Sequence, residues 1–464
     1  MNSININKKI LENYKMKLFN ELVKLIWTDE IEDINNLPEK VLGEDIFNKF
    51  DKGTIINLLR VVMGLNPIEE YDLDLNKILY EALNLNEISQ PIISIISNAC
   101  THCEENKINQ ACLVKDKHNY CNEKNTCSAC GACISKCSLG AISDKIQFIP
   151  MIKLLKDNNS SVYAIVAPSI IGQFGDDVTL GRMRSSLKKI GFKDMIEVAV
   201  AADILTVKES YEYYNHMNKK DSGYFITSCC CPIWVNLIQK NYPEILENMS
   251  PSVSPMIACA RIIKIFEPNS KVVFIGPCIA KKKEATLDDL KDAVDFVLTF
   301  TEIEEILKAL NINPEDMEDD ERIESSLSGR IYGKSGGVSK AIELTVKSID
   351  EDIVFKGQSF NGTKNCIDGI EKIINKEIDA TFIEGMGCVG GCIGGPKRIL
   401  TVDEGEKCID KYSEDTNMIT AFDNLNVAQI LAFMSIKRTE YLGKKEEKQV
   451  TEIFNRNIKG GVDN

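Results

Sequence analysis

The chain has 464 residues, of which 44% are hydrophobic and 27% are charged, and its formal net charge is −14. This length allows two or three domains, and the acidic balance argues against nucleic acid and anionic membrane as partners, because both bind a basic face. No apolar run reaches membrane-spanning length, and residues 1–19 are amphipathic, unlike a secretory signal. We therefore expect a cytoplasmic protein, whose 17 cysteines are reduced and serve metal binding or catalysis.

Residues 1–96 are predicted to form a small helical domain. Apolar side chains recur at helical spacing from Ile10 to Ile26, which predicts a helix over residues 8–27, and helical patterns continue to about Leu85. A structural cap is the simplest interpretation of this domain, and interaction with a partner is the alternative.

Residues 97–148 are predicted to form a ferredoxin-like domain. Eight cysteines lie between Cys100 and Cys137, and large apolar residues are few, so metal must supply the fold. The last four cysteines have the bacterial ferredoxin spacing, in which three bind one 4Fe–4S cluster and the fourth reaches a second. Zinc, which also binds paired Cys-x2-Cys, is the alternative. We assign one cluster to Cys100, Cys103, Cys112 and Cys137. We assign the other cluster to Cys121, Cys127, Cys130 and Cys133.

Residues 149–464 alternate between strand and helix patterns, which predicts an α/β architecture with parallel sheets. The predicted strands are residues 162–168, 223–228, 271–277, 295–300 and 381–386. The predicted helices lie near residues 180–190, 203–217, 232–246, 254–266, 301–311, 337–349 and 365–377, and Thr301 to Glu304 form a predicted capping box. Three of the strands run directly into cysteine loops. Ligands collect beyond the carboxyl ends of such strands, so we expect one shared site there.

The three cysteine loops resemble the signatures of iron–iron hydrogenases, in the family's order. They are Thr-Ser-Cys-Cys-Cys-Pro-Ile-Trp at 227–234, Gly-Pro-Cys-Ile-Ala-Lys-Lys-Lys-Glu at 276–284, and Glu-Gly-Met-Gly-Cys-Val-Gly-Gly-Cys-Ile-Gly-Gly-Pro at 384–396. The resemblance covers roughly residues 149–400 and implies a two-lobed catalytic domain with parallel sheets around a central cluster. The triple cysteine resembles a less studied subgroup of these enzymes.

The resemblance implies a reaction and its cofactor. The enzymes reversibly reduce protons to dihydrogen, with ferredoxin or flavodoxin as electron partner. Their H-cluster is a 4Fe–4S cubane bridged to a two-iron subcluster with carbonyl, cyanide and azadithiolate ligands, and maturation enzymes supply the subcluster. The implied cubane ligands are Cys231, Cys278, Cys388 and Cys392, with Cys392 as the bridge. Soft thiolates suit this chemistry.

The resemblance also implies roles for residues around the cluster. The proton-delivering thiol is Cys230 when the first signature is anchored on Pro232, and Cys229 when it is anchored on Thr227. From that thiol the implied relay runs through Glu212, Ser254 and Glu284, although solvated helix charge is the simpler interpretation of the two glutamates. Residues implied to contact the cofactor are Lys281, Met386, Ser228 and Pro277. Lys282 and Lys283 are interpreted as a surface run.

The chain departs from the family pattern at three places. Gly276 replaces the usual methionine, Gly387 replaces a small alanine, and the stretch after Cys392 is shortened to Ile-Gly-Gly-Pro-Lys. These changes affect the surroundings of the cluster and leave its ligands intact. A hydrogen sensor, a relative used in cluster assembly, or an electron-transfer protein with little turnover is therefore the alternative function.

Overall fold

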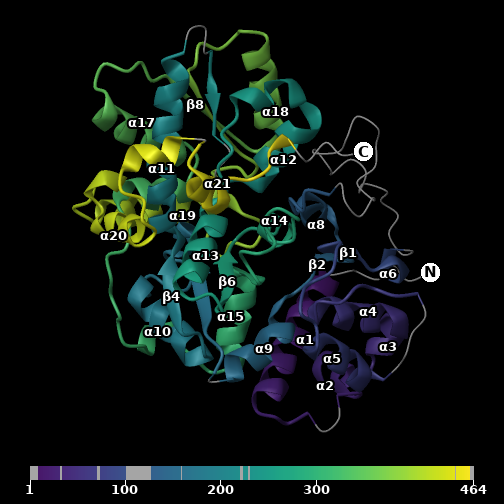
Figure 1. Ribbon diagram of the computed structural model, residues 1–464. Coiled ribbons are helices and arrows are strands. Elements are labelled where there is room, and N and C mark those ends of the chain that lie inside the picture. Colours follow the sequence, from purple (N-terminus) through teal and green to yellow (C-terminus); the bar gives the residue numbers. More distant parts are fainter. Residues whose placement is uncertain are drawn as a thin grey trace.

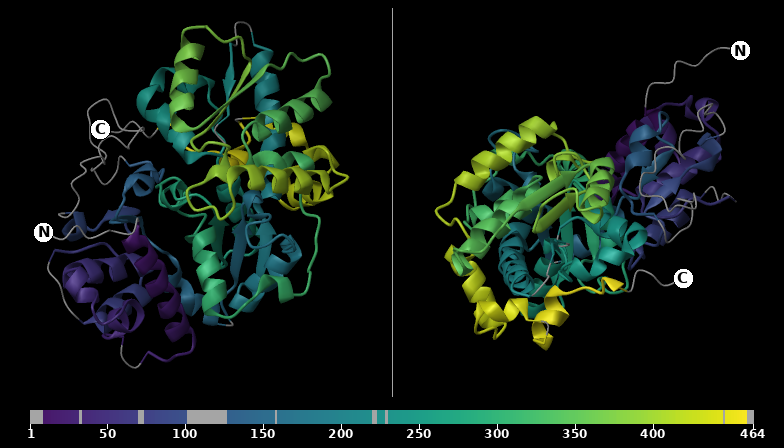
Figure 2. Two further views of the ribbon diagram at one scale, coloured as in Figure 1. Left: turned by 180° about the vertical axis from the view of Figure 1, so that it is seen from behind. Right: turned by 90° about the horizontal axis from the view of Figure 1, so that it is seen from above.

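The computed structural model describes residues 9–31, 34–69, 74–100, 127–157, 159–219, 223–227, 230–444 and 446–459, apart from the side chain of Cys100. Figure 1 shows two lobes, each built on its own sheet, and a helical N-terminal part beside one of them. In Figure 2 the N-terminal part also lies to one side of the two lobes, so it packs against their flank.

The N-terminal part contains short helices around one long helix. Helix α1 (Ile10–Trp27) confirms the predicted helix over residues 8–27, and its inner face buries Leu18, Phe19 and Leu22. The shorter helices are α2 (Leu37–Leu42), α3 (Ile46–Lys49), α4 (Lys52–Val62) and α5 (Leu75–Leu83). Carboxylates of Asp51 and Asp74 accept hydrogen bonds at the N-termini of α4 and α5, which defines where these helices begin.

A strand pair encloses the cysteine-dense segment. Strand β1 (Ile93–Ile95) runs antiparallel to β2 (Ile142–Asp144). The chain leaves β1 through α6 (Ser97–Cys100) and returns to β2 through α8 (Ala132–Lys136). The first and last described parts of the segment are therefore held together by backbone pairing. Helix α9 (Phe148–Lys156) then leads into the two lobes.

The first lobe contains a four-stranded parallel sheet in the order β4-β3-β6-β7. Its strands are β3 (Val162–Val166), β4 (Asp194–Glu197), β6 (Lys271–Gly276) and β7 (Phe296–Thr299). The helices are α10 (Leu180–Ile190), α13 (Pro255–Phe266), α14 (Ala280–Glu284) and α15 (Phe300–Ala309). Strand β4 was not predicted, because its sequence Asp-Met-Ile-Glu has no apolar run. The switch in strand order falls between β3 and β6.

The second lobe contains a three-stranded parallel sheet in the order β5-β9-β8. Its strands are β5 (Phe225–Ile226), β8 (Gly357–Asn361) and β9 (Phe382–Met386). Its helices are α12 (Pro232–Asn241), α17 (Gly337–Ile349) and α18 (Thr363–Ile374). Strand β8 was not predicted, because Gly-Gln-Ser-Phe-Asn lies at the sheet edge and is only partly buried.

Helix α11 (Val198–Met217) lies between the lobes and is buried along most of its length. It includes the buried ionisable residues Asp203, Lys208, Glu209 and Glu212, each of which finds a polar partner in a neighbouring element or within the helix. The remaining helices are α16 (Leu327–Arg330), α19 (Val402–Glu414), α20 (Leu425–Phe433) and α21 (Lys448–Phe454). No described helix is both long enough and apolar enough to cross a membrane.

The predicted capping box lies two residues too far along the chain. The cap of α15 is Thr299, whose hydroxyl accepts from the Glu302 amide at 3.3 Å, while Glu302 accepts from the Thr299 amide at 2.9 Å. The box from Thr301 to Glu304 is therefore wrong. Glu302 lies in the interior, where its second carboxylate oxygen accepts a hydrogen bond from another buried side chain.

Candidate iron–sulfur site between the lobes

Three strand ends deliver the cysteine loops to the boundary between the two lobes. Strand β5 ends at Ile226, and Cys231 forms the N-cap of α12. Strand β6 ends at Gly276 and leads to Cys278. Strand β9 ends at Met386 and leads to Cys388. One loop therefore comes from the first sheet and two come from the second, as the shared-site prediction requires.

Backbone contacts join the three loops. The Gly387 amide donates to the Cys231 sulfur at 3.3 Å, which connects the first loop to the third. The Lys397 amide donates to the Pro277 carbonyl at 3.0 Å, which connects the second loop to the third. Gly387 permits this closeness, since a Cβ atom there would lie 2.6 Å from Ile233 Cγ2. The loops are thus one physical site, although Cys231 in the first loop and Cys392 in the last are 161 positions apart in the chain.

The four predicted cubane thiols influence one another electrostatically. Burial, followed by repulsion from Cys231 and Cys392, raises the pKa of Cys278 to about 12. Burial, followed by repulsion from Cys278, Cys231 and Cys392, raises the pKa of Cys388 well above its usual range. The mutual repulsion shows that these sulfurs lie near one another, and a metal centre that binds them would have to remove their protons.

The four cysteines suit an iron–sulfur cluster as ligands. Within the described residues, no three Cys, His, Asp or Glu side chains converge closely enough to hold one metal ion. An iron–sulfur cube is wider than an ion, because each thiolate binds a different iron atom. The donor set of four half-buried cysteines and the glycine-containing loops fit such a group.

Lys281 places a positive charge beside the thiols. Its ammonium donates to the Glu284 carboxylate at 2.6 Å, and both side chains are buried. Burial lowers the pKa of Lys281, but the Glu284 carboxylate and the nearby Cys278 and Cys392 outweigh burial and leave the pKa above its usual value. Lys281 therefore remains a cation near the cysteines, and Glu284 orients it.

A chain of polar side chains leads away from the first cysteine loop. The Thr227 hydroxyl donates to the Glu209 carboxylate at 2.6 Å, and Ser250 donates to Glu212 at 2.7 Å. Ser250 also lies close enough to Glu209 to help to lower its pKa. Lys208 donates to Glu212 at 2.5 Å. Two buried carboxyls and a hydroxyl thus lie in series.

The predicted proton relay stays a prediction, although the structure describes its members Glu212, Ser254 and Glu284. In the part of the chain that the structure describes, no hydrogen bond joins Glu212, Ser254 and Glu284 to one another. The Ser254 hydroxyl is buried without a hydrogen-bond partner among the described residues, and Glu284 is engaged by Lys281 and by Arg456 at 3.8 Å. The residue that sequence reasoning missed is Glu209. Its spacing of three from Glu212 on a helix places both carboxyls on one face, which was the available signal.

The pKa of Glu209 predicts a pH dependence of folding stability. Burial, followed by repulsion from Glu212, raises this pKa from 4.5 to about 7. Since the folded state then binds the proton more tightly than the unfolded state, stability falls as pH rises from about 4.5 to about 7. Glu209→Gln should remove this loss, which is on the order of 3 kcal/mol. Urea unfolding of both proteins at about pH 5 and about pH 7.5 checks the prediction. A stability difference that stays constant with pH would contradict it.

We call residues 97–148 the accessory segment, and its described part from Cys127 onward packs directly on the cysteine loops. Cys130 lies near enough to Cys388 to add to the rise in its pKa, after burial and the three loop cysteines. The Ser128 hydroxyl donates to Asn236 on α12. Gly131 fits tightly, since a Cβ atom there would lie 3.1 Å from Ile279 and 3.3 Å from Pro396. The run from Cys127 to Cys137 therefore lies beside the predicted cubane site.

Some of the other predicted residues lie near the site, and some lie outside the part of the chain that the structure describes. Met386 is buried at the end of β9, and a Cβ atom on Gly391 would lie 2.8 Å from its sulfur, so Met386 packs against the third loop. Ser169, after β3, has a buried hydroxyl without a partner among the described residues, an orphaned donor that sequence reasoning also missed. The predicted residues outside the description are Ser228, Cys229, Cys103, Cys112, Cys121 and the side chain of Cys100.

Comparison with known proteins agrees with this geometry. A family model described as "Iron only hydrogenase large subunit, C-terminal domain" matches residues 160–396. The NADP-reducing hydrogenase subunit HndD of Solidesulfovibrio fructosivorans is 26% identical over 58% of this chain, and iron hydrogenase 1 of Clostridium pasteurianum is 28% identical over 68%. The chain covers 55% and 64% of the length of these two relatives. A probable cytosolic Fe-S cluster assembly factor of Aedes aegypti is 21% identical over 59% of the chain.

Solved structures support the fold. The apo [FeFe]-hydrogenase HydA1 from Chlamydomonas reinhardtii superposes with a TM-score of 0.55 at 18% identity, covering 66% of this chain and 96% of that one. The strand-end cysteine loops, the two parallel sheets and the match over residues 160–396 agree with one another. This chain belongs to the iron-only hydrogenase large-subunit family.

Proposed function

We propose that this chain is an iron–iron hydrogenase that reversibly reduces protons to dihydrogen with electrons from a ferredoxin or a flavodoxin. The observation that carries the proposal is the joining of three strand-end loops, which places Cys231, Cys278, Cys388 and Cys392 around one site. Two features supply the surroundings that catalysis needs: the Lys281 cation and the polar chain that ends at Thr227.

The residues present fit the H-cluster. Cys231, Cys278, Cys388 and Cys392 would hold its cubane, with Cys392 toward the two-iron subcluster. When bound, the cluster supplies the electrons and the open iron position at which protons are reduced. Lys281 would orient a negatively charged ligand, because Glu284 holds its ammonium in a fixed place. Maturation enzymes would be partners of the chain, since the subcluster is not made from protein groups.

The chain's own groups would supply protons from the α11 side. Cys230 precedes Cys231 in the chain and is half-buried. A thiol that exchanges protons with an interior path is expected to be half-buried in this way. Glu209, whose pKa is raised to about 7, can both accept and release a proton near neutral pH. The Ser250 hydroxyl donates to Glu212 and lies close enough to Glu209 to affect its pKa, so we propose Glu209, Ser250 and Glu212 as the path.

Electrons would enter through the accessory clusters. The run from Cys127 to Cys137 packs on the third cysteine loop, with Cys130 near Cys388. A cluster bound by Cys121, Cys127, Cys130 and Cys133 would therefore be the one next to the cubane. The second accessory cluster, with Cys100, Cys103, Cys112 and Cys137 as ligands, would pass electrons to the first.

A protein with little turnover is the second candidate function. The relatives include probable cytosolic Fe-S cluster assembly factors, so membership of the family alone does not distinguish catalysis from cluster handling. Gly276 and Gly387 also alter the surroundings of the predicted cubane. The buried Lys281 and the polar chain at Glu209 favour catalysis, because a cluster carrier has no need of a proton path.

Infrared spectroscopy of anaerobically matured protein tests the proposal. We expect bands in the carbonyl and cyanide region, together with hydrogen evolution from reduced methyl viologen in the same sample. Bands without appreciable turnover would favour a sensor. The absence of bands after maturation would overturn the hydrogenase proposal and leave an electron carrier or a cluster-assembly protein. Protein made without maturation enzymes is the matched control and should show neither bands nor hydrogen.

A further inference from the structure

Six charged side chains form a buried cluster where the N-terminal part meets the lobes. They belong to α1, β2, α14, α15 and the stretch after Cys392. We define this six-charge cluster by its members, which are Glu12, Lys15, Asp144, Lys282, Glu302 and Lys397. Three are basic and three are acidic, so the cluster is balanced in formal charge. Lys282 is fully buried here, so its interpretation as part of a surface run was wrong.

Asp144 is the centre of the six-charge cluster. Its carboxylate lies 2.8 Å from the Lys282 ammonium, 2.9 Å from that of Lys397 and 3.3 Å from that of Lys15. Burial would raise the pKa of Asp144, but the three lysines outweigh burial and hold this pKa well below its usual range. Asp144 is therefore a charged group held by three cations from three separate elements.

Two of the lysines come from the cysteine loops themselves. Lys282 follows Cys278 by four residues and also donates to Glu302 at 2.5 Å. Lys397 follows Cys392 by five residues, donates to Glu12 at 2.8 Å, and is only 7% exposed. Their partners Glu12 and Asp144 belong to the N-terminal helix and to the strand that closes the accessory segment. The contacts with Glu12 and Asp144 thus cross from a cubane loop to the electron-entry side.

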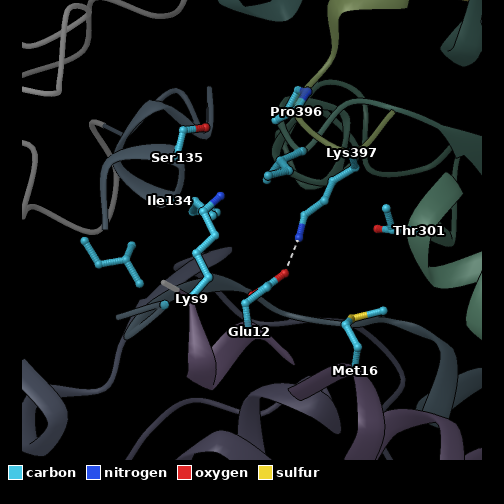
Figure 3. Close-up of a pocket in the computed structure, with 11 residues that line it drawn as sticks. Lys9, Glu12, Met16, Ile134, Ser135, Thr301, Pro396 and Lys397 are labelled. Carbon is cyan, nitrogen blue, oxygen red and sulfur yellow. Dashed lines mark hydrogen bonds and ion pairs between the residues drawn. The ribbon is translucent and has the colours of Figure 1, made fainter. Parts of the chain in front are cut away.

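Figure 3 shows the place where Lys397 makes this crossing. The Lys397 side chain extends toward Glu12, with Ser135 and Ile134 of the accessory segment on one side and Thr301 on the other. These residues line a cavity of about 210 Å³. The cavity lies between α1, the accessory segment and the stretch after Cys392, so apolar packing alone does not fill the junction between them. The ion pair between Lys397 and Glu12 spans this junction.

Stability is a poor explanation for the six-charge cluster. Removing charges from water costs several kcal/mol per ion, and buried ion pairs are often no more stabilising than apolar residues of similar volume. What a buried ion cluster supplies is one preferred arrangement, because every displaced partner leaves an unpaired charge. The junction that it fixes is the one where Cys130 lies near Cys388.

We propose that the six-charge cluster is a positioning device for electron delivery, with Lys397 as its main positioning residue. It holds the accessory segment at a fixed spacing from the cubane loops, so that electrons pass from one cluster to the next. The proposal deepens the proposed function and rests on it. It also assigns a role to α1, which holds the accessory segment in place through contacts of Glu12 and Lys15.

Lys397→Met is the first variant to test. We expect hydrogen evolution with reduced ferredoxin as donor to fall at least about tenfold through kcat, with KM for ferredoxin nearly unchanged, because the docking surface is not altered. Lys397→Arg keeps the charge and should retain most of the rate. Lys334→Met is the matched control, since Lys334 lies beside the third cysteine loop and pairs with Asp410, away from the accessory segment. It should leave the ferredoxin-driven rate within about twofold of the wild type.

A second readout does not depend on hydrogen turnover. In reduced protein made without maturation enzymes, the magnetic interaction between the cubane and its neighbouring cluster can be followed by electron paramagnetic resonance. We expect the interaction in the wild type, in Lys397→Arg and in Lys334→Met, and its weakening in Lys397→Met. If the wild type shows the interaction but evolves no hydrogen after maturation, the hydrogenase proposal fails while the positioning proposal is still tested.

A double variant separates position from charge. Lys397→Met with Glu12→Gln leaves two basic and two acidic members in the six-charge cluster. The formal charges are then balanced again, but the ion pair between Lys397 and Glu12 is absent. If the six-charge cluster acts by positioning, the magnetic interaction should stay weak in the double variant. If it acts only through its net charge, the magnetic interaction should recover. Recovery in the double variant, or an unchanged interaction in Lys397→Met, would overturn the proposal. If Lys397→Met does not fold, Glu12→Gln alone, at a side chain that is 20% exposed, should give a smaller loss of the same kind.

Discussion

Cys278→Ala is expected to leave the chain without its cubane and without measurable hydrogen evolution. Cys278 is the single predicted ligand that follows a strand of the first sheet, whereas Cys231, Cys388 and Cys392 follow strands of the second. Alanine offers no metal-binding atom, and the remaining three thiols all lie on one side of the boundary between the lobes. Iron analysis should therefore show the loss of one four-iron cluster, and the accessory clusters should keep their resonance signals.

Cys259→Ala is the matched control for this substitution. Cys259 is buried whereas Cys278 is half-buried, and Cys259 lies on α13 and follows no strand end. Its replacement should leave both the iron content and the hydrogen rate close to those of the wild type. Retention of the cubane in Cys278→Ala would show that the ligand set is wrong, and equal losses in both variants would point to general damage of the fold.

Glu209→Gln should reduce hydrogen evolution on the order of 10²- to 10⁴-fold, the usual contribution of a positioned proton-transfer group. The amide keeps the size of the side chain and can still accept from the Thr227 hydroxyl, but it cannot take up and release a proton. Binding of the cofactor should be unaffected. The infrared bands of the matured variant should therefore match those of the wild type while turnover is lost.

Asp203→Asn serves as the control for Glu209→Gln. Asp203 is fully buried on the same helix and its pKa is also raised, to about 6, by burial. Its carboxylate accepts from Ser326 at 2.5 Å and from Asn424, so it connects α11 to the chain before α16 and lies off the path to Thr227. A hydrogen rate in Glu209→Gln no lower than that in Asp203→Asn would exclude Glu209 from the proton path.

The strands that carry the cysteine loops could be predicted from the sequence because they are buried on both faces. Runs such as Lys-Val-Val-Phe-Ile-Gly at β6 are continuous and apolar, and each ends directly at a cysteine. The cubane ligands followed from the same loops by resemblance to a known family. Strand β8 was missed for the opposite reason, because an edge strand needs no apolar run.

Pairings between distant residues could not be predicted. Lys282 stands in a run of three lysines, which normally indicates a solvated surface, and only the fold brings Asp144 and Glu302 to it. The relay through Glu212, Ser254 and Glu284 was implied by the family resemblance and stays a prediction. The structure also places Ser250 beside Glu212, and a loop of ordinary polar residues carries no sequence signal for such a contact.

Because the cysteine loops follow strands of two sheets, the cubane would cross-link the chain. Cys231 and Cys278 are 47 positions apart in the chain, and Cys278 and Cys388 are 110 positions apart. Closing loops of this size removes freedom from the unfolded chain worth on the order of 4 kcal/mol each. The cluster would then act as a covalent staple as well as a catalyst. A chain that loses iron to oxygen or a chelator should separate at the lobe boundary and become a substrate for proteases, so its lifetime should follow the supply of iron and sulfide.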